Sequence, residues 1–266
     1  MSSETFSHFQ NLLRNERSFD RLFCYVSKGS RFDIYYNDQF KDDPVFNHAV
    51  IDDSILSSAV DVNAGTASVL LHEIKMEAAK IHVPPTIFVE EFWEKSRFVQ
   101  KAAIEEGYLV GGSMEVLSKI VGSKSHLASE ALVLETVDSK MWNEVFMSSY
   151  SIPPSWKVEL IRREQMLSTS DTTKLLLAWD TQKRPVGCML THIKPPDYFG
   201  IYCVGTVPDM RHRGVAKAML HKAESIALAH GCKYLTLQTI SSDGVTPMYL
   251  KYGFKLEFKR AVLLAP

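Results

Sequence analysis

The sequence predicts a mixed α/β fold, an α+β arrangement around a mixed sheet, divided between two domains. The chain has 266 residues, a length that favours two modest domains over one large one. Hydrophobic residues make up 45% and charged residues 23%, which is typical of a soluble globular protein with a core. In the second half, strand-like and helical patterns follow one another in the mixed order of an α+β domain.

The elements of the second half follow from local patterns. Pro153-Pro154 ends one helical stretch, and apolar residues at helical spacing predict a later helix that Gly231 caps. The expected order is a strand at 131–135, helices at 139–147 and 156–166, strands at 174–179, 185–193 and 199–207, a helix at 215–230, a strand at 234–238, a helical turn at 247–252 and a strand pair within 254–264.

The first half repeats part of this order, which suggests a duplicated fold with one divergent copy. It has a helix at 68–81, a strand at 86–89, a helix at 93–105 and then Gly107-Tyr108, which matches the later Gly253-Phe254. The polar, small-residue stretch 122–129 is the expected hinge. We therefore expect domains at 1–126 and 127–266.

Charge and composition argue against several kinds of partner. The net charge is −1 and no polybasic stretch occurs, so neither nucleic acid nor an anionic membrane is expected to bind. The N-terminus lacks the pattern of a signal peptide, and no apolar run would cross a bilayer. The four cysteines are far apart, and the nine histidines show no metal-ligand spacing. We expect a reduced, cytoplasmic protein without a metal.

The segment most informative about chemistry is 205–216, which joins a strand to a helix. A glycine-containing turn at a helix N-terminus presents unpaired backbone N–H groups and the positive end of the helix dipole, which suits a phosphate or pyrophosphate. Gly214 allows close approach of an anion, Ala216 keeps the first helical turn small, and Arg211 and Arg213 add positive charge at the rim. Neither a P-loop nor a dinucleotide-binding glycine motif is present. Taken alone, such a turn is also common without any ligand.

Two motifs in this half resemble the signatures of the GNAT superfamily of acyltransferases. Val207-Pro208 followed by Arg211, Gly214 and Ala216 is similar to the family's acetyl-CoA signature, R-x-x-G-x-G/A. Met248-Tyr249-Leu250-Lys251-Tyr252-Gly253-Phe254 is similar to its second signature, a tyrosine on a short helix followed by Gly-Phe. The resemblance covers roughly residues 131–264 and implies a GNAT-like acyl-CoA-binding fold, with two copies in tandem if the first half is a degenerate copy.

The resemblance also implies roles for individual residues, with acetyl-CoA as the acyl donor. The strand before the loop would pair with the pantetheine arm, and a backbone N–H at Val204 or Gly205 would polarise the thioester carbonyl. Tyr249 is the candidate general acid for the departing thiolate, its alternative being an aromatic that closes the short helix. Ser242 is either a cofactor contact or a loop cap. The expected cofactor-binding residues are Val204, Gly205, Thr206, Val207, Arg211, His212, Arg213, Gly214, Val215, Ala216, Lys217 and Ser242.

The general base stays unassigned from sequence. Relatives often carry a glutamate on the strand that matches 199–207, but this strand has no acidic residue. His192 has the most suitable intrinsic pKa, although a histidine at a strand end is more often structural. A water relay or a neutral acceptor would also suffice. The other candidates are Asp197, Tyr198 and Tyr202 nearby, and Glu135, Glu159 and Glu164 further off.

The first half lacks the arginine–glycine motif. Where that motif would precede a helix, the chain has Asp61-Val-Asn-Ala-Gly65-Thr-Ala67, which is unsuited to a pyrophosphate. Its aromatic residues are expected in the core. The prediction is a tandem N-acetyltransferase that transfers an acetyl group from acetyl-CoA to an amine of a small molecule, by direct attack in a ternary complex. The alternatives are a protein or peptide amine as acceptor, and a non-catalytic acyl-CoA sensor or scaffold.

Overall fold

The computed structural model describes residues 2–41, 43–57, 63–122, 132–136, 138–167 and 170–265. The chain divides into two compact units that are not consecutive halves. Unit 1 comprises Met1–Leu22, Leu117–Leu237 and Met248–Lys255, and unit 2 comprises Phe23–Val116, Gln238–Pro247 and Leu256–Pro266. The expected boundary at 126/127, most of the expected hinge, and Ala131 and Asp61 lie outside the described residues.

Unit 1 carries the two sequence motifs on a mixed sheet with strand order β10-β9-β8-β7-β6. Only the β9–β10 pair is parallel, and the neighbouring strands from β9 to β6 are antiparallel. Its elements are α1 (Ser3–Phe23), β6 (Leu132–Thr136), α5 (Ser139–Tyr150), η2 (Pro154–Trp156), α6 (Lys157–Leu167), β7 (Thr173–Trp179), β8 (Pro185–Ile193), β9 (Tyr198–Thr206), η3 (Pro208–Met210), α7 (Val215–Ala229), β10 (Tyr234–Ile240) and α8 (Thr246–Lys251), the last two extending into unit 2.

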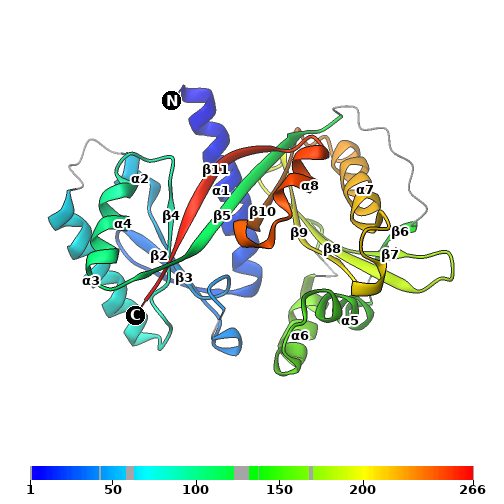
Figure 1. The fold of residues 1–266 in the computed structure, drawn as a ribbon, viewed down its shortest axis with the longest axis horizontal. Coiled ribbons are helices and arrows are strands. Elements are labelled where there is room, and N and C mark those ends of the chain that lie inside the picture. Colours follow the sequence, from blue (N-terminus) through cyan, green and yellow to red (C-terminus); the bar gives the residue numbers. More distant parts are fainter. Residues whose placement is uncertain are drawn as a thin grey trace. The chain divides into compact units, whose positions relative to one another are not determined.

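Two glycines allow α5 and α7 to pack on opposite faces of this sheet (Figure 1). A Cβ at Gly187 would lie 2.6 Å from Val215 Cγ1 at the start of α7, while one at Gly205 would lie 2.7 Å from Ser149 Cβ in α5. Gly187 pairs with Thr206 and Cys188 with Gly205, so Gly187 and Gly205 belong to alternate positions of the β8–β9 ladder. Glycine is therefore needed for the close approach of each helix.

Helix α1 packs on the same unit, which the sequence patterns did not predict. Asn15 Nδ2 donates hydrogen bonds to the carbonyls of Lys194 and Tyr198, at 2.8 and 3.4 Å. Tyr202 donates to Asn15 Oδ1 at 2.6 Å, and its ring stacks on Phe19 with the centroids 3.6 Å apart. These contacts join the N-terminal helix to residues nearly two hundred positions later in the chain.

Unit 2 contains strands in the order β1-β2-β3-β4-β11-β5, with both parallel and antiparallel pairs. Its core includes Phe32, and Tyr35 and Phe88 are also buried, as expected for the aromatic residues of the first half. The expected final strand pair is one continuous strand, β11. The elements are β1 (Tyr25–Lys28), β2 (Phe32–Tyr36), η1 (Asp38–Phe40), β3 (His48–Ile51), α2 (Asp53–Ser57), α3 (Ala64–Lys80), β4 (Ile87–Glu90), α4 (Ser96–Glu105), β5 (Leu109–Ile120), η4 (Ser241–Asp243) and β11 (Lys255–Leu264).

Candidate active site

The loop between β9 and α7 forms an open cradle of backbone N–H groups. His212 and Gly214 both have left-handed backbone conformations, with φ of 62° and 82°. Gly214 is the N-cap of α7 without a side-chain cap, and a Cβ placed on it would meet no atom within 4 Å. Among the described residues, the N–H groups of 212–217 have no hydrogen-bond acceptor. Left-handed turns at a helix N-terminus are suited to binding an anion.

Arg211 makes two hydrogen bonds within the protein. Its Nη2 donates to the Ser149 carbonyl at 2.8 Å and its Nε to the Thr206 carbonyl at 3.4 Å. The guanidinium thus binds the C-terminal end of α5 and positions the loop, and its expected role as a charge at the rim stays a prediction. His212 and Arg213 are exposed beside the cradle. Positive charge beside the cradle comes from the exposed Arg211 and Arg213 and from the dipole of α7.

The remaining residues of the motif position this cradle. Val207 follows the end of β9 at Thr206, and its N–H donates to the Val186 carbonyl at 3.1 Å. Val215 is buried against β8, which fixes the start of α7, and Ala216 is half-buried. Lys217 is half-buried and lines a small pocket together with His221, Glu224 and Tyr252.

Strand β9 is paired on both sides only along its first part. Its parallel pairing with β10 runs from Tyr198 to Gly200, whereas its pairing with β8 continues to Thr206. In the described sheet, residues 201–206 thus face no partner strand on the β10 side. An extended molecule that carries amide groups, such as a pantetheine arm, can pair with an edge of this kind.

A β-bulge lies in this half-paired stretch. Cys188 is opposite Gly205 and Leu190 is opposite Tyr202, so Met189 faces both Cys203 and Val204. Cys203 has a φ of 53°, unusual for a residue other than glycine. Two residues of α5 support the bulge, because Trp142 Nε1 donates to the Met189 carbonyl at 3.1 Å and the Tyr150 hydroxyl to the Val204 carbonyl at 2.9 Å. The bulge thus redirects the backbone at the residues expected to polarise a thioester.

Tyr249 lies on α8 and is 7% exposed. Its ring packs edge-on against Phe254, the phenylalanine of the Gly-Phe motif, with the centroids 5.8 Å apart. Burial raises the pKa of Tyr249 to about 12, so the phenol keeps its proton at neutral pH. Burial and the retained proton fit both the catalytic and the packing interpretation, so the role of Tyr249 as general acid stays a prediction. Ser242 lies exposed in the 3-10 turn η4 of unit 2.

His192, the leading candidate base from sequence, belongs to the contacts that attach α1. Its Nε2 hydrogen-bonds the Ser18 hydroxyl at 2.9 Å and its Nδ1 the Thr173 hydroxyl at 3.0 Å. Burial lowers the pKa of His192 to about 4, so the imidazole is neutral at physiological pH. Both ring nitrogens have partners, and the histidine is structural.

The other nearby candidates also have structural partners. Tyr198 hydrogen-bonds His8 at 2.9 Å, and Asp197 pairs with Lys233 at 2.9 Å. Tyr202 binds Asn15 as described above. Each of these three side chains is therefore bound to a partner within the fold. Glu135 pairs with Lys174 at 3.2 Å.

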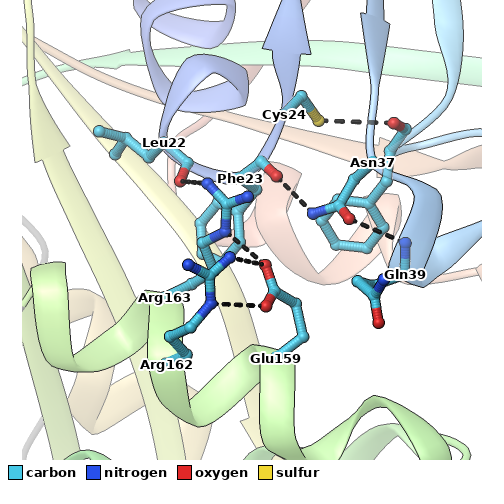
Figure 2. A network of polar contacts seen from close by, with 9 residues as sticks. Leu22, Phe23, Cys24, Asn37, Gln39, Glu159, Arg162 and Arg163 are labelled. Carbon is cyan, nitrogen blue, oxygen red and sulfur yellow. Dashed lines mark hydrogen bonds and ion pairs between the residues drawn. The ribbon is translucent and has the colours of Figure 1, made fainter. Parts of the chain in front are cut away.

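The two glutamates of α6 have contrasting environments. Figure 2 shows Glu159 held by Arg162 and Arg163, whose Nε atoms lie 2.8 and 2.7 Å from its carboxylate, while Arg163 also donates to the Leu22 carbonyl. These arginines lower the pKa of Glu159. Glu164, five residues later, is 1% exposed and pairs with no cation among the described residues.

Unit 2 lacks an equivalent of the open cradle at the matching helix. Helix α3 has Asn63 as its N-cap, and the Asn63 side chain accepts from the Thr66 N–H at 3.1 Å while the Thr66 hydroxyl accepts from the Asn63 N–H at 2.8 Å. This capping box satisfies donors that α7 leaves open. The difference supports the expected divergence of the first copy.

A bulged strand with one free edge, followed by an anion cradle at a helix N-terminus, defines the class of the fold as acyl-CoA-binding. The model of the acetyltransferase (GNAT) family matches residues 139–254, and this part of the chain is a GNAT acetyltransferase domain. Members of that family take their acyl group from acetyl-CoA.

Solved structures extend the likeness over both halves of the chain. A GCN5-related N-acetyltransferase from Kribbella flavida has a TM-score of 0.69 at 12% identity, with 98% of this chain and 94% of that chain covered. One from Sphaerobacter thermophilus has a TM-score of 0.65 at 15% identity, covering 95% and 89%. The glucosamine N-acetyltransferase region of a fungal multi-domain GH3 β-N-acetylglucosaminidase has a TM-score of 0.61 at 13% identity. This match covers 94% of this chain and 34% of that chain. These likenesses confirm the predicted GNAT-like fold.

No curated protein matches the sequence. In the part of the chain that the structure describes, no helix is long and apolar enough to cross a membrane. Within the same residues, no group of three or more His, Cys, Asp or Glu side chains is placed to hold a metal ion.

Proposed function

We propose that this protein transfers an acetyl group from acetyl-CoA to an amine of a small molecule. The observation that carries the proposal is the open N–H cradle at 212–217, which directly follows a bulged strand with a free edge. The cradle would receive the pyrophosphate, and the free edge of β9 would pair with the pantetheine arm. The thioester carbonyl would then lie at the bulge, where the N–H of Val204 or Gly205 stabilises the oxyanion.

Direct attack in a ternary complex is supported by the state of the nearest thiols. The Cys203 thiol is enclosed although part of the residue is exposed, and burial, helped by the charge of Glu164, raises its pKa to about 12. Burial also raises the pKa of Cys188 well above its usual value. The thiolate is the nucleophilic form of cysteine, so neither residue is ready to form an acyl-enzyme. The amine itself would attack the thioester carbon.

Tyr249 would complete the reaction as proton donor. The tetrahedral intermediate collapses with cleavage of the C–S bond, and the departing CoA thiolate takes the phenolic proton. The raised pKa of Tyr249 keeps that proton in place until the thiolate forms. All four cysteines are free, which agrees with the proposed cytoplasmic location.

The test combines binding with turnover. We expect acetyl-CoA to raise the melting temperature of the purified protein, and desulfo-CoA to do the same, whereas adenosine 3′,5′-bisphosphate alone should have a smaller effect. Release of CoA thiol is then followed with glucosamine, tyramine, spermidine and aniline as acceptors. Glucosamine is included because one protein of similar fold is described as a glucosamine N-acetyltransferase region. Absence of any shift with acetyl-CoA would refute the proposed activity, and a shift without turnover would favour an acyl-CoA sensor.

A further inference from the structure

Two buried polar side chains in unit 1 have no role in the fold described so far. Asn143 on α5 is 0% exposed and Glu164 on α6 is 1% exposed. Asn143 Nδ2 donates to Glu164 Oε1 at 3.2 Å. The other oxygen of each residue, Asn143 Oδ1 and Glu164 Oε2, is buried without a hydrogen-bond partner. A buried polar atom left unpaired destabilises the fold by about 1–3 kcal/mol, so two such atoms side by side require an explanation.

The chemistry of the two oxygens specifies what is missing. Both are acceptors when Glu164 is ionised, so the partner that would satisfy them is a hydrogen-bond donor. An amine or ammonium nitrogen carries two or three N–H groups and can donate to both oxygens together. Burial without a cation favours the neutral carboxylic acid, so Glu164 would ionise as such a donor binds.

This pair belongs to the two helices on the α5 side of the bulge that is assigned to the acyl group, and α5 packs on both β8 and β9. Trp142, the chain neighbour of Asn143, donates from Nε1 to the carbonyl of Met189, the residue opposite the bulge, and the Tyr150 hydroxyl donates to the Val204 carbonyl. Burial is the main cause of the raised pKa of Cys203 and of Cys188, and the charge of Glu164 adds to it, which agrees with this placement. Close to Gly205 the side chains are small, because Ser149 and the Cys188 sulfur lie within 3 Å of the position of a Cβ on that glycine.

We propose that Glu164 and Asn143 receive the acceptor amine, and that Glu164 is the base that takes its proton. This inference rests on the proposed acetyl transfer. The amine lone pair forms the C–N bond to the thioester carbon, the proton on the attacking nitrogen passes to the Glu164 carboxylate, and the C–S bond breaks as the thiolate takes the Tyr249 proton. Asn143 orients the carboxylate through Nδ2 and accepts a second N–H of the amine at Oδ1. The base thus comes from α6, and the strand that lacks an acid does not need one.

The titration of this carboxyl agrees with the role. Burial raises the pKa of Glu164 to about 8, and the hydrogen bond from Asn143 opposes that rise. The titratable groups that face it are Cys188 on β8 and Cys203 on β9. Charged groups on the adjacent elements are engaged elsewhere: Glu144 of α5 with Lys157, Lys174 of β7 with Glu135, and Arg162 and Arg163 of α6 with Glu159. A base with a pKa near the working pH is efficient.

The experiment compares three variants with the wild-type protein across pH. CoA release with glucosamine, tyramine, spermidine and aniline is measured from about pH 6 to about pH 9, with acetyl-CoA binding followed by thermal shift. Glu164→Gln keeps the shape and the bond to Asn143 but cannot take a proton. Glu144→Gln is the matched control, an exposed glutamate on the neighbouring helix. Asn143→Ala removes the hydrogen bond that lowers the pKa of Glu164.

We expect wild-type kcat to rise about tenfold per pH unit and to level off near pH 8, where Glu164 is ionised. Glu164→Gln should lose on the order of 10²-fold in kcat and show no such rise, with an unchanged shift by acetyl-CoA. Glu144→Gln should match the wild type. Asn143→Ala should move the rising limb to higher pH, a change that a purely structural role would not produce.

The inference about Glu164 and the proposed acetyl transfer would fail with different experimental results. Glu164→Gln with wild-type kcat and pH profile overturns the inference while leaving the proposed function intact. If Glu164→Gln does not fold, the inference is overturned when kcat of Asn143→Ala rises over the same pH range as that of the wild type. Binding of acetyl-CoA by the wild type without turnover of any of the four amines rejects an amine site at Glu164. A wild type that acetyl-CoA does not stabilise refutes the proposed function itself.

Discussion

The backbone cradle at the start of α7 predicts that, of two chemically identical substitutions at the two ends of this helix, only the one at the cradle will weaken ligand binding. Gly214 precedes α7 with φ of 82°, and Gly231 follows it with φ of 70°. A Cβ at either glycine would meet no atom within 4 Å. Gly214→Glu and Gly231→Glu therefore introduce the same side chain, in the same backbone conformation, into open space.

The expected magnitudes follow from this match. The left-handed conformation costs a residue with a Cβ about 1–2 kcal/mol, so both variants should lose roughly that much stability. A carboxylate near a helix N-terminus is favourable by about 0.3–1 kcal/mol and one near the C-terminus unfavourable by a similar amount. Without ligand, Gly214→Glu should consequently be the more stable of the two. Its carboxylate would nevertheless occupy the anion cradle.

The assay is thermal unfolding with and without acetyl-CoA. At a concentration of about 100 Kd, a ligand stabilises the wild type by about 2.7 kcal/mol, which for a chain of this size corresponds to a shift of roughly 5–10 °C. Gly231→Glu should keep this shift and Gly214→Glu should lose most of it. Retention of the full shift by Gly214→Glu, or an equal loss in both variants, would refute the placement of the pyrophosphate at 212–217.

Four further outcomes are expected from single residues. Tyr249→Phe should keep acetyl-CoA binding, measured by calorimetry, and lose on the order of 10²-fold in kcat, because only the phenolic hydroxyl with its proton is removed. An unchanged kcat would reject Tyr249 as the acid. Arg211→Ala should destabilise by about 1–2 kcal/mol in urea unfolding, because its bonds to the Ser149 and Thr206 carbonyls are lost. Gly205→Val should cost about 1–3 kcal/mol in the same assay, because the new Cβ would lie 2.7 Å from Ser149 Cβ. Glu164 keeps its proton in the native state up to about pH 8 but releases it near 4.5 when unfolded, so wild-type stability falls as pH rises between these values. Glu164→Gln should avoid this loss and be more stable than the wild type at about pH 8, by on the order of a few kcal/mol. Equal stability of the two proteins at that pH would contradict a buried neutral carboxyl.

Local patterns were sufficient for the elements and for the cradle. The helix at 215–230 and the strands around it depend on apolar spacing, which reports the hydrophobic face of each element directly. The two motifs at 207–216 and 248–254 also depend on local backbone geometry, because a left-handed residue such as Gly214 is specified by the absence of a side chain. The family, the mixed fold and the open end of α7 could all be predicted for this reason.

Long-range contacts decided what the candidate side chains do. Arg211 binds the end of α5, 62 residues earlier, and His192 hydrogen-bonds Ser18, 174 residues earlier. Neither partner could be chosen from spacing, because any of many hydroxyls or carbonyls would serve equally well in the sequence. Burial is also set by residues distant in the chain, since Glu164 becomes buried only when α6 packs on α5 and β7.

The sequence by itself therefore determined the class of this protein, its fold and the position of the open N–H groups at the start of α7, all of which depend on residues close together in the chain. Only the tertiary structure decided that Arg211 binds the end of α5 and that His192 is structural, and only there is Glu164 buried with one carboxyl oxygen bound by Asn143 and the other without a partner. The physical reason is that hydrogen-bond partners and desolvation are properties of the packed molecule, set by residues that meet only when α1, α5 and α6 dock on the sheet of unit 1.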